Sequence, residues 1–177
     1  MKKITIICGS PHQNSHSDAL AEAFAAGASA AGHAVEIIKL TKKNFEPCRG
    51  CDHCRNSGNW ECILHDDMTE MLALIESSDV VAMATPLYFL TVSAQLKAFI
   101  DRFYCAHHAG RIRGKKGVLL TTSGGPGSPV LTDYFKALCG LLGWEDAGSV
   151  AQGGMPRAGE GLGDGKKAEA FGLGEMV

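Results

Sequence analysis

The chain has 177 residues, of which 45% are hydrophobic and 20% charged, and its formal net charge at pH 7 is -2. This composition suits one globular domain, and without a basic stripe it excludes nucleic acid and anionic membrane surfaces as expected partners. The longest apolar runs have the length of a strand, well short of the roughly 20 residues that span a bilayer. Because no signal-peptide pattern follows the initial "MKK", we expect a cytosolic protein whose seven cysteines are reduced.

Short apolar runs that end at turn residues alternate along the chain with helical patterns. The apolar runs predict strands at residues 3–8, 34–40, 79–86, at the start of 115–127 and, more weakly, at 144–152. Helical spacing and end signals predict helices at residues 17–32, 66–78, 91–103, 128–143 and, with weak character, 165–177. This alternation favours a parallel sheet with helices on both faces. We expect a single domain over residues 1–177, with a cysteine-rich insertion at 45–65 and a glycine-rich tail at 153–177.

The loop after the first predicted strand has the composition of a phosphate site. It supplies the amide of Asn14, the N–H groups of a helix start, and the hydroxyls of Ser10, Ser15 and Ser17. A helix N-terminus carries partial positive charge and unpaired donors, which favour a phosphate. The dinucleotide and triphosphate patterns G-x-G-x-x-G and G-x-x-x-x-G-K-S/T are absent from this loop. The alternative is a simple capped turn.

The loops after the third and fourth predicted strands have the composition of walls for a flat heterocycle. The loop "TPLYFLT" supplies an apolar wall from Pro86, Leu87, Tyr88 and Phe89. The loop "TTSGGPG" permits close approach at Gly124 and Gly125, which have no side chains. Taken singly, an aromatic cluster is typical of a core and a glycine run of a turn. Because ligands of parallel sheets bind at the carboxyl ends of strands, three such loops together favour one binding site.

A compact group of four cysteines comprises Cys48, Cys51, Cys54 and Cys62. Their spacing, C-x2-C-x2-C-x7-C, is closer to a ferredoxin-type pattern than to the paired C-x2-C units of structural zinc sites. Soft thiolates suit both iron–sulfur clusters and zinc. Without a metal, they would be packing or redox residues able to form a disulfide on oxidation, and spacing leaves these alternatives open. Of the other cysteines, Cys8 and Cys139 are expected in the core and Cys105 in a loop.

Four stretches together carry a resemblance to a known family: "ICGSPHQNSHS", "CRGCDHCRNSGNWECILHDDM", "SSDVVAMATPLYFLTVSAQLKAFIDR" and "TTSGG". Over residues 3 to about 152, the chain resembles the flavodoxin-like NAD(P)H-dependent FMN reductases and, within that superfamily, the iron–sulfur flavoproteins. The resemblance implies a flavodoxin-like α/β fold, in which a doubly wound parallel sheet of five strands in the order 2-1-3-4-5 binds FMN.

The resemblance also implies the contacts of the cofactors. By position, the FMN phosphate would be held by Ser10, His12, Asn14, Ser15 and Ser17. The isoalloxazine ring would be lined by Pro86, Leu87, Tyr88 and Phe89, and its pyrimidine side flanked by Ser123, Gly124 and Gly125. A [4Fe–4S] cluster would be held by Cys48, Cys51, Cys54 and Cys62. The loop departs from the family pattern at His16, where many relatives have a small polar residue.

The activity implied is that of an FMN-dependent oxidoreductase, which passes reducing equivalents from NAD(P)H to a flavin, quinone or similar small-molecule acceptor. Hydride transfer to a flavin needs no general acid or base, so no catalytic side chain is predicted. The cysteines favour an alternative, electron transfer from a ferredoxin-like donor through the cluster and FMN. An alternative of another class is a noncatalytic binding module stabilised by zinc. The resemblance also implies a homodimer or tetramer, and Lys97 and Asp101 are expected to pair on a helix.

Overall fold

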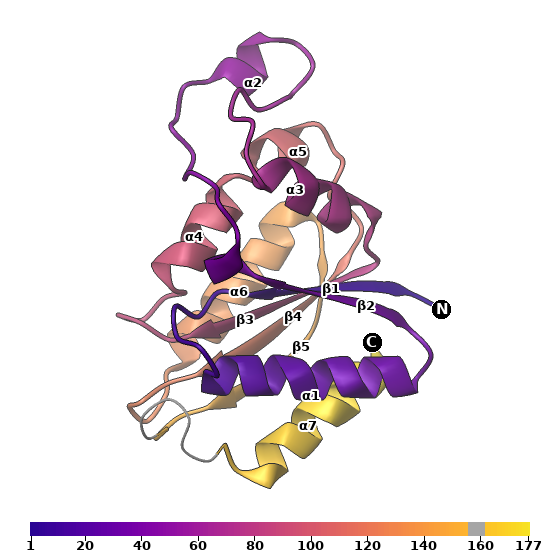
Figure 1. Ribbon diagram of the computed structural model, residues 1–177, viewed down its shortest axis with the longest axis vertical. Helices are drawn as coiled ribbons and strands as arrows, with labels where there is room; N and C mark the ends of the chain where they lie inside the picture. The colour runs from indigo at the N-terminus through magenta and orange to yellow at the C-terminus, as the bar shows by residue number, and fades with distance from the viewer. Residues whose placement is uncertain (156–161) are drawn as a thin grey trace.

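The structure is a computed structural model that describes residues 1–155 and 162–177. Residues 156–161, part of the expected glycine-rich tail, lie outside the described residues. One parallel sheet is formed by β1 (Lys3–Cys8), β2 (Ala34–Lys39), β3 (Val80–Pro86), β4 (Lys116–Thr122) and β5 (Glu145–Gln152). Its strand order is β2-β1-β3-β4-β5, which confirms the predicted flavodoxin-like topology (Figure 1).

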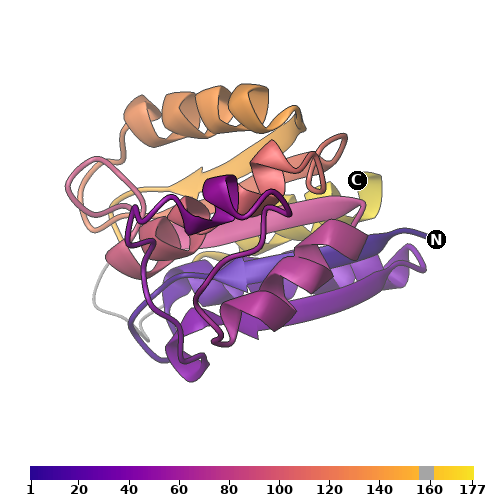
Figure 2. The same cartoon turned by 90° about the horizontal axis from the view of Figure 1, so that it is seen from above.

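Helices cover both faces of the sheet (Figures 1 and 2). One face carries α1 (His16–Ala30) and α7 (Asp164–Met176). The other carries α3 (Met68–Ser77), α4 (Ala94–Asp101), α5 (Tyr104–His108) and α6 (Pro129–Leu142). Side chains alternate along each strand, so Ile6 packs into the core under α1 while Ile7 packs into the core under α3 and α4. β3 and β4 are buried on both faces, which explains why they read as continuous apolar runs.

Serine and glycine set the ends of several helices. The hydroxyl of Ser15 accepts the Asp18 N–H at 3.1 Å at the start of α1. At the start of α6, Ser128 accepts the Val130 N–H at 3.3 Å, and Pro129 occupies the first turn. Gly143 ends α6 in the left-handed conformation with φ 69°. The N-terminal and C-terminal signals predicted for residues 128–143 are therefore confirmed.

The helix predicted over residues 91–103 differs from the structure at both ends. Ser93 caps its start, since its hydroxyl accepts the Leu96 N–H at 3.2 Å, and α4 begins at Ala94. Beyond Arg102 the chain turns and forms the short helix α5, whose Cys105 is buried at 4% exposure. The expectation that Cys105 lies in a loop is therefore wrong, because apolar neighbours on α5 draw this segment into the core. Cys8 and Cys139 are buried as expected.

The cysteine-rich residues 45–65, hereafter the cysteine segment, lie between the 3-10 helix η1 (Leu40–Lys42) and α3. Their regular structure is the short helix α2 (His53–Asn56), which stands at the top of Figure 1. None of the helices within the described ranges is long and apolar enough to cross a membrane.

The C-terminal helix α7 packs closely on α1 through two glycines. A Cβ atom built on Gly27 of α1 would overlap the backbone carbonyl of Phe171. A Cβ atom built on Gly174 of α7 would overlap the Phe24 carbonyl and lie 2.8 Å from the Ala28 nitrogen. The two helices therefore meet backbone against backbone, at positions where only glycine fits.

Candidate functional site

The loop between β1 and α1 gathers buried hydroxyls at the start of a helix. Ser10, Ser15 and Ser17 are 4%, 6% and 1% exposed. The hydroxyls of Ser15 and Ser17 lie 3.1 Å apart, and Ser10 accepts the His12 N–H at 3.2 Å. Asn14 turns the chain with a φ of 52°, a left-handed conformation that asparagine tolerates better than most residues. The loop thus presents hydroxyls and a helix N-terminus together, as a phosphate requires.

Contacts with the start of α4 fix this loop. The hydroxyl of Ser93 donates to the Gly9 carbonyl at 2.5 Å, and the Ser93 N–H donates to the Thr85 hydroxyl at 3.1 Å. A Cβ atom on Gly9 would lie 2.7 Å from the Leu96 Cβ, so glycine is needed where the loop crosses α4. The loop is therefore held by a rigid helix and a buried strand.

A pocket of about 480 Å³ opens at the carboxyl ends of β1, β3 and β4. Nine of the twelve residues predicted for a cofactor line it: Ser10, His12, Ser15, Ser17, Pro86, Leu87, Tyr88, Ser123 and Gly124. The other three, Asn14, Phe89 and Gly125, do not line it. His16, Thr122 and Met155 line it as well and were not predicted. His16 is buried at 9% exposure in the first turn of α1, directly after the N-cap.

The loop after β3 explains why Phe89 points away. Tyr88 and Thr91 exchange two backbone hydrogen bonds of 3.0 Å, which close a two-residue turn. Both residues of that turn, Phe89 and Leu90, have positive φ values of 47° and 66°. A tight turn of this kind projects its central side chains into solvent, and Phe89 is fully exposed. Leu87 is anchored instead, because its N–H donates to the Thr122 carbonyl at 2.8 Å.

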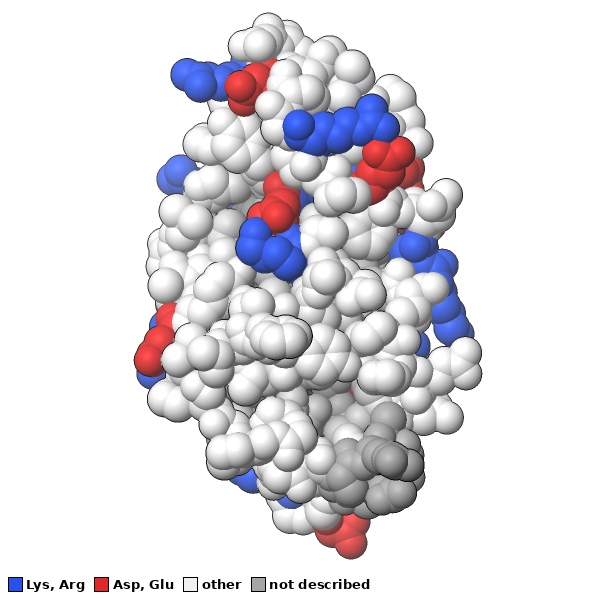
Figure 3. All heavy atoms as spheres, turned by 90° about the vertical axis from the view of Figure 1, so that its left-hand side faces the viewer, with Lys and Arg blue, Asp and Glu red and all other residues white. Residues whose placement is uncertain are grey.

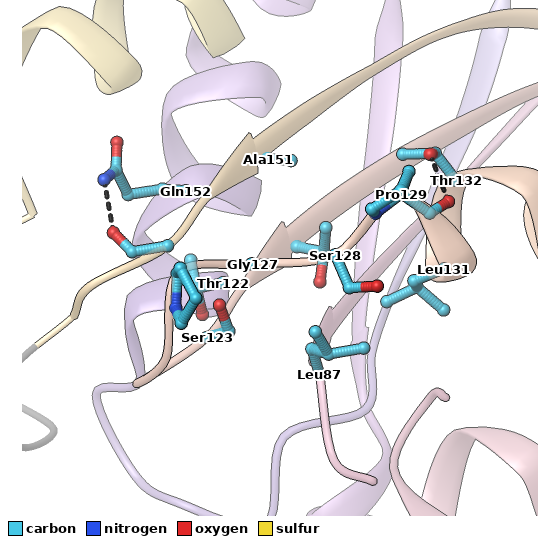
Figure 4. A pocket seen from close by; sticks show the side chains of 13 residues that line it. Leu87, Thr122, Ser123, Gly127, Ser128, Pro129, Leu131, Thr132, Ala151 and Gln152 are labelled. Atoms are coloured by element: carbon cyan, nitrogen blue, oxygen red, sulfur yellow. Dashed lines mark hydrogen bonds between the residues drawn. The ribbon is translucent and has the colours of Figure 1, made fainter. Parts of the chain in front are cut away.

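A second pocket of about 320 Å³ adjoins the first and shares Leu87, Thr122 and Ser123 with it (Figure 4). Its remaining walls come from β4, the loop between β4 and α6, the start of α6 and the end of β5: Thr121, Pro126, Gly127, Ser128, Pro129, Leu131, Thr132, Ala151, Gln152 and Gly153. None of these remaining residues was predicted from the sequence. The end of β5 lies beside that of β4 in a parallel sheet, so a strand-end rule applied to the weak fifth strand would have found this part of the site.

The charge distribution suits an uncharged ring at this end of the molecule. Figure 3 views the face formed by the carboxyl ends of the strands, and charged side chains gather toward its upper part, where the cysteine segment lies. The lining of both pockets contains no Lys, Arg, Asp or Glu side chain among residues 1–155 and 162–177. Polar character comes from hydroxyls, backbone groups, the two histidines of the first pocket and the Gln152 amide of the second.

The four cysteines of the cysteine segment are free thiols that line one pocket of about 160 Å³. Other residues of the cysteine segment and Tyr104 of α5 form the rest of its walls. Burial raises the pKa of the Cys54 thiol above its ordinary value. In the described part of the chain, no three cysteine, histidine or acidic side chains are grouped closely enough to hold a metal ion. The thiols are gathered around one space, but they do not converge on a point within it.

The base of the cysteine segment is closed by a buried ion pair, which we call the Arg102 clamp. Arg102, whose side chain is 2% exposed, donates to both carboxylate oxygens of Asp66, at 2.8 and 3.1 Å, and to the Glu46 carbonyl at 2.7 Å. Asp66 also accepts the Glu46 N–H at 3.0 Å. Burial alone would raise the pKa of Asp66, but hydrogen bonds from Arg102 and Glu46 outweigh it and hold the pKa below 3.8. One guanidinium thus joins the two ends of the segment.

The far end of the cysteine segment rests on α5. The ring of Trp60 stacks on His108 with a centroid separation of 5.2 Å and an interplanar angle of 15°. Tyr104 contacts both rings, with centroids 6.4 Å from Trp60 and 4.5 Å from His108.

The expected pair of Lys97 with Asp101 forms on α4 at 2.6 Å, exposed to solvent. It lies outside both strand-end pockets and has no part in either.

Comparison with known proteins gives consistent matches. The family model described as NADPH-dependent FMN reductase matches residues 2–150. An iron-sulfur flavoprotein of Archaeoglobus fulgidus is 36% identical over 129 residues, which cover 73% of this chain and 57% of that protein. FMN-dependent NADH:quinone oxidoreductase 5 of Pseudomonas fluorescens is 34% identical over 100 residues, 49% of each chain. The chain spans less than two thirds of the length of the first curated relatives.

Solved structures share the fold. The NAD(P)H:quinone oxidoreductase from Methanothermobacter marburgensis superposes with a TM-score of 0.77 at 24% identity, covering 98% of this chain and 94% of that one. An azoreductase from Bacillus anthracis str. Sterne superposes with a TM-score of 0.78 at 22% identity, covering both chains completely. These likenesses extend over the full doubly wound sheet and its helices.

Proposed function

The chain belongs to the NADPH-dependent FMN reductase family of oxidoreductases, and we propose that it binds FMN and passes reducing equivalents from NAD(P)H to a small quinone or flavin acceptor. One observation carries this proposal. The loops after β1, β3 and β4 converge on a single pocket that joins a hydroxyl-rich helix start to an apolar wall. Relatives named as FMN-dependent NADH:quinone oxidoreductases support the same reaction class.

The residues of the pocket fit both the phosphate and the ring of FMN. Ser10, Ser15 and Ser17 would hold the phosphate with the N-terminus of α1, whose partial positive charge favours an anion. Leu87 and Tyr88 would pack on the ring, while exposed Gly124 leaves room beside it, since a Cβ there would meet only the Met155 carbonyl at 3.7 Å. FMN, when bound, supplies a ring that accepts a hydride and returns electrons singly or in pairs. The chain binds, orients and shields that ring.

The experiment that tests the proposed function follows the visible absorbance of the flavin under anaerobic conditions. FMN-loaded protein is expected to bleach on addition of NADPH or NADH, and a simple quinone is expected to restore the colour. Comparison of the two nicotinamides then identifies the donor. Bound FMN that stays oxidised with both nicotinamides would contradict the proposal.

A second candidate function is electron transfer through a [4Fe–4S] cluster held by the cysteine segment. The supporting observation is that all four cysteines line one pocket, and thiolates are the usual ligands of such clusters. A relative named iron-sulfur flavoprotein at 36% identity supports this candidate as well. Cluster binding would require the four thiols to lie closer together than they do in this structure. A ferredoxin-like protein is the proposed donor, since a cluster handles one electron at a time.

Replacing Cys51 with serine is expected to abolish iron and sulfide retention after anaerobic reconstitution, because one thiolate ligand is lost. Iron and acid-labile sulfide are measured per chain in the wild type and the variant. Cys139→Ala is the control: Cys139 is a buried core cysteine, 1% exposed, on α6 and outside the cysteine segment, and this variant should retain both iron and sulfide. Wild-type protein that takes up zinc but no iron, or no metal at all, would contradict the cluster and favour the zinc or metal-free alternative.

A further inference from the structure

A buried carboxylate stands at the helix start that forms the phosphate end of the pocket. Asp18 is 4% exposed in the first turn of α1, and its own N–H donates to the Ser15 hydroxyl at 3.1 Å. One of its carboxylate oxygens, Oδ2, lies 3.3 Å from the Lys39 Nζ. The other, Oδ1, is buried and has no hydrogen-bond partner within the described residues. Asp18 therefore depends on Lys39 for the compensation of its charge.

Lys39 comes from a different element and reaches across to α1. It ends β2, where it pairs in register with Cys8 at the end of β1. Its Nζ lies 3.5 Å from Glu22, one turn further along α1, as well as 3.3 Å from Asp18. Burial alone would lower the pKa of Lys39, but attraction and hydrogen bonding from Asp18 outweigh it and raise that pKa. Burial raises the pKa of the adjacent Cys8 thiol to about 12, and Asp18 adds to the effect.

A phosphate at this helix start would meet an electrostatic conflict. The helix N-terminus attracts an anion, yet a carboxylate within the same turn repels it. Among the described residues, no lysine or arginine lines the pocket, so neither type of side chain would contact the phosphate directly. Lys39 lies behind the first turn and neutralises the carboxylate there. At the effective dielectric constant of a protein surface, an uncompensated charge roughly 10 Å away changes anion affinity on the order of tenfold, and a nearer charge changes it by more.

We propose that Lys39 is a positioning residue that sets the preference for phosphorylated over unphosphorylated flavin, by neutralising Asp18 behind the phosphate end of the pocket. This inference rests on the proposed binding of FMN. It extends that function by assigning cofactor discrimination to a residue outside the lining of the pocket. Riboflavin shares the ring and ribityl chain of FMN and lacks the phosphate, so a comparison of the two flavins isolates the electrostatic effect.

The test measures dissociation constants of FMN and riboflavin by fluorescence quenching, at low ionic strength, on the full chain. Lys39→Met is expected to weaken FMN binding about tenfold while riboflavin affinity changes by less than about twofold. The double variant Asp18→Asn with Lys39→Met is expected to recover the FMN affinity, since the repelling carboxylate is gone. Lys43→Met is the matched control: it removes an equal charge from an ion pair with Glu70, 3.4 Å long and on the outer side of α3, and should leave the ratio unchanged.

Several outcomes would overturn this inference. Equal weakening of both flavins in Lys39→Met would make the residue merely structural, and an unchanged FMN affinity would remove its role altogether. If Lys39→Met does not fold, Asp18→Asn alone decides, because it should tighten FMN relative to riboflavin and an unchanged ratio overturns the inference. Wild-type protein that binds neither flavin would instead contradict the proposed function, so the two failures are distinguishable.

Discussion

Replacing Arg102 with glutamine is expected to destabilise the protein by about 3–5 kcal/mol, the range for breaking a buried ion pair by removal of one partner. The Arg102 clamp holds Asp66 with two hydrogen bonds and Glu46 with a third. Without the guanidinium, the Asp66 carboxylate stays largely buried with no counter-charge, and the two ends of the cysteine segment lose their common partner. Chemical denaturation followed by circular dichroism measures the change in free energy of unfolding.

The control for this prediction is Arg49→Gln. Arg49 pairs with Glu46 at 2.6 Å, but both side chains are 57% exposed, and exposed pairs contribute at most about 1 kcal/mol. Arg102→Lys should fall between the wild type and Arg102→Gln, because lysine keeps the charge and loses the planar fork that binds both carboxylate oxygens. Equal stabilities of the Arg102→Gln and Arg49→Gln variants would contradict a clamp.

The contribution of the clamp is also expected to depend on pH. The folded-state pKa of Asp66 lies below its ordinary value of 3.8. A depressed carboxyl pKa contributes stability that is fully present above the unfolded-state value and is lost as the pH falls through the folded-state value. The stability difference between the wild type and Arg102→Gln should therefore be largest near neutral pH and shrink as the pH falls toward and below 3.8, where the Asp66 carboxylate becomes protonated.

Substitution of alanine at Gly27 is expected to separate α7 from α1 and to lower the free energy of unfolding by about 1–3 kcal/mol, the cost of overpacking. The added Cβ would occupy the position of the Phe171 carbonyl, which is backbone and has no rotamer to escape into. Hydrogen exchange by mass spectrometry should show loss of protection along α7, because α1 is its main contact. Denaturation measures the accompanying loss of stability.

Gly172→Ala provides a control on α7, the helix that packs against Gly27. A Cβ at Gly172 meets nothing within 4 Å, although the residue lies only two positions from Gly174. Alanine is favoured over glycine in a helix by up to about 1 kcal/mol, so this variant should be unchanged or more stable. The two glycine-to-alanine changes thus have opposite expected signs, and a stabilised Gly27→Ala variant would contradict the backbone contact between the helices.

Local sequence patterns were sufficient for the sheet and for most helix ends. Apolar runs as in β3 and β4 identify strands buried on both faces, and Ser128 with Gly143 marks both ends of α6. Local patterns were insufficient where tertiary contacts decide. Cys105 belongs to α5 because its neighbours in the core hold that segment. The local pattern "YCAHHAG" does not predict this packing. Phe89 lies outside the pocket because a two-residue turn with positive φ values projects it into solvent.

Most of the first pocket was predictable because strand ends in a parallel sheet meet at one edge. The contacts that were not predicted join residues far apart in the sequence. Arg102 and Asp66 are 36 positions apart, and Gly27 faces a helix at the opposite end of the chain. The second pocket was missed because it needs the end of β5, the weakest strand pattern. Spacing alone also could not show that the four thiols surround one pocket without converging.

Titration of FMN into the wild type and a Gly124→Trp variant shows whether the flavin binds in the pocket at the strand ends. Gly124 is exposed, and a Cβ there has its nearest neighbour at 3.7 Å, so the fold tolerates the change while the indole fills the space beside the ring. Wild-type protein is expected to quench FMN fluorescence with one flavin per chain, whereas Gly124→Trp is expected to keep its unfolding free energy but lose FMN binding. Failure of the wild type to bind FMN, or equal binding by both proteins, would contradict a flavin site at the carboxyl ends of β1, β3 and β4.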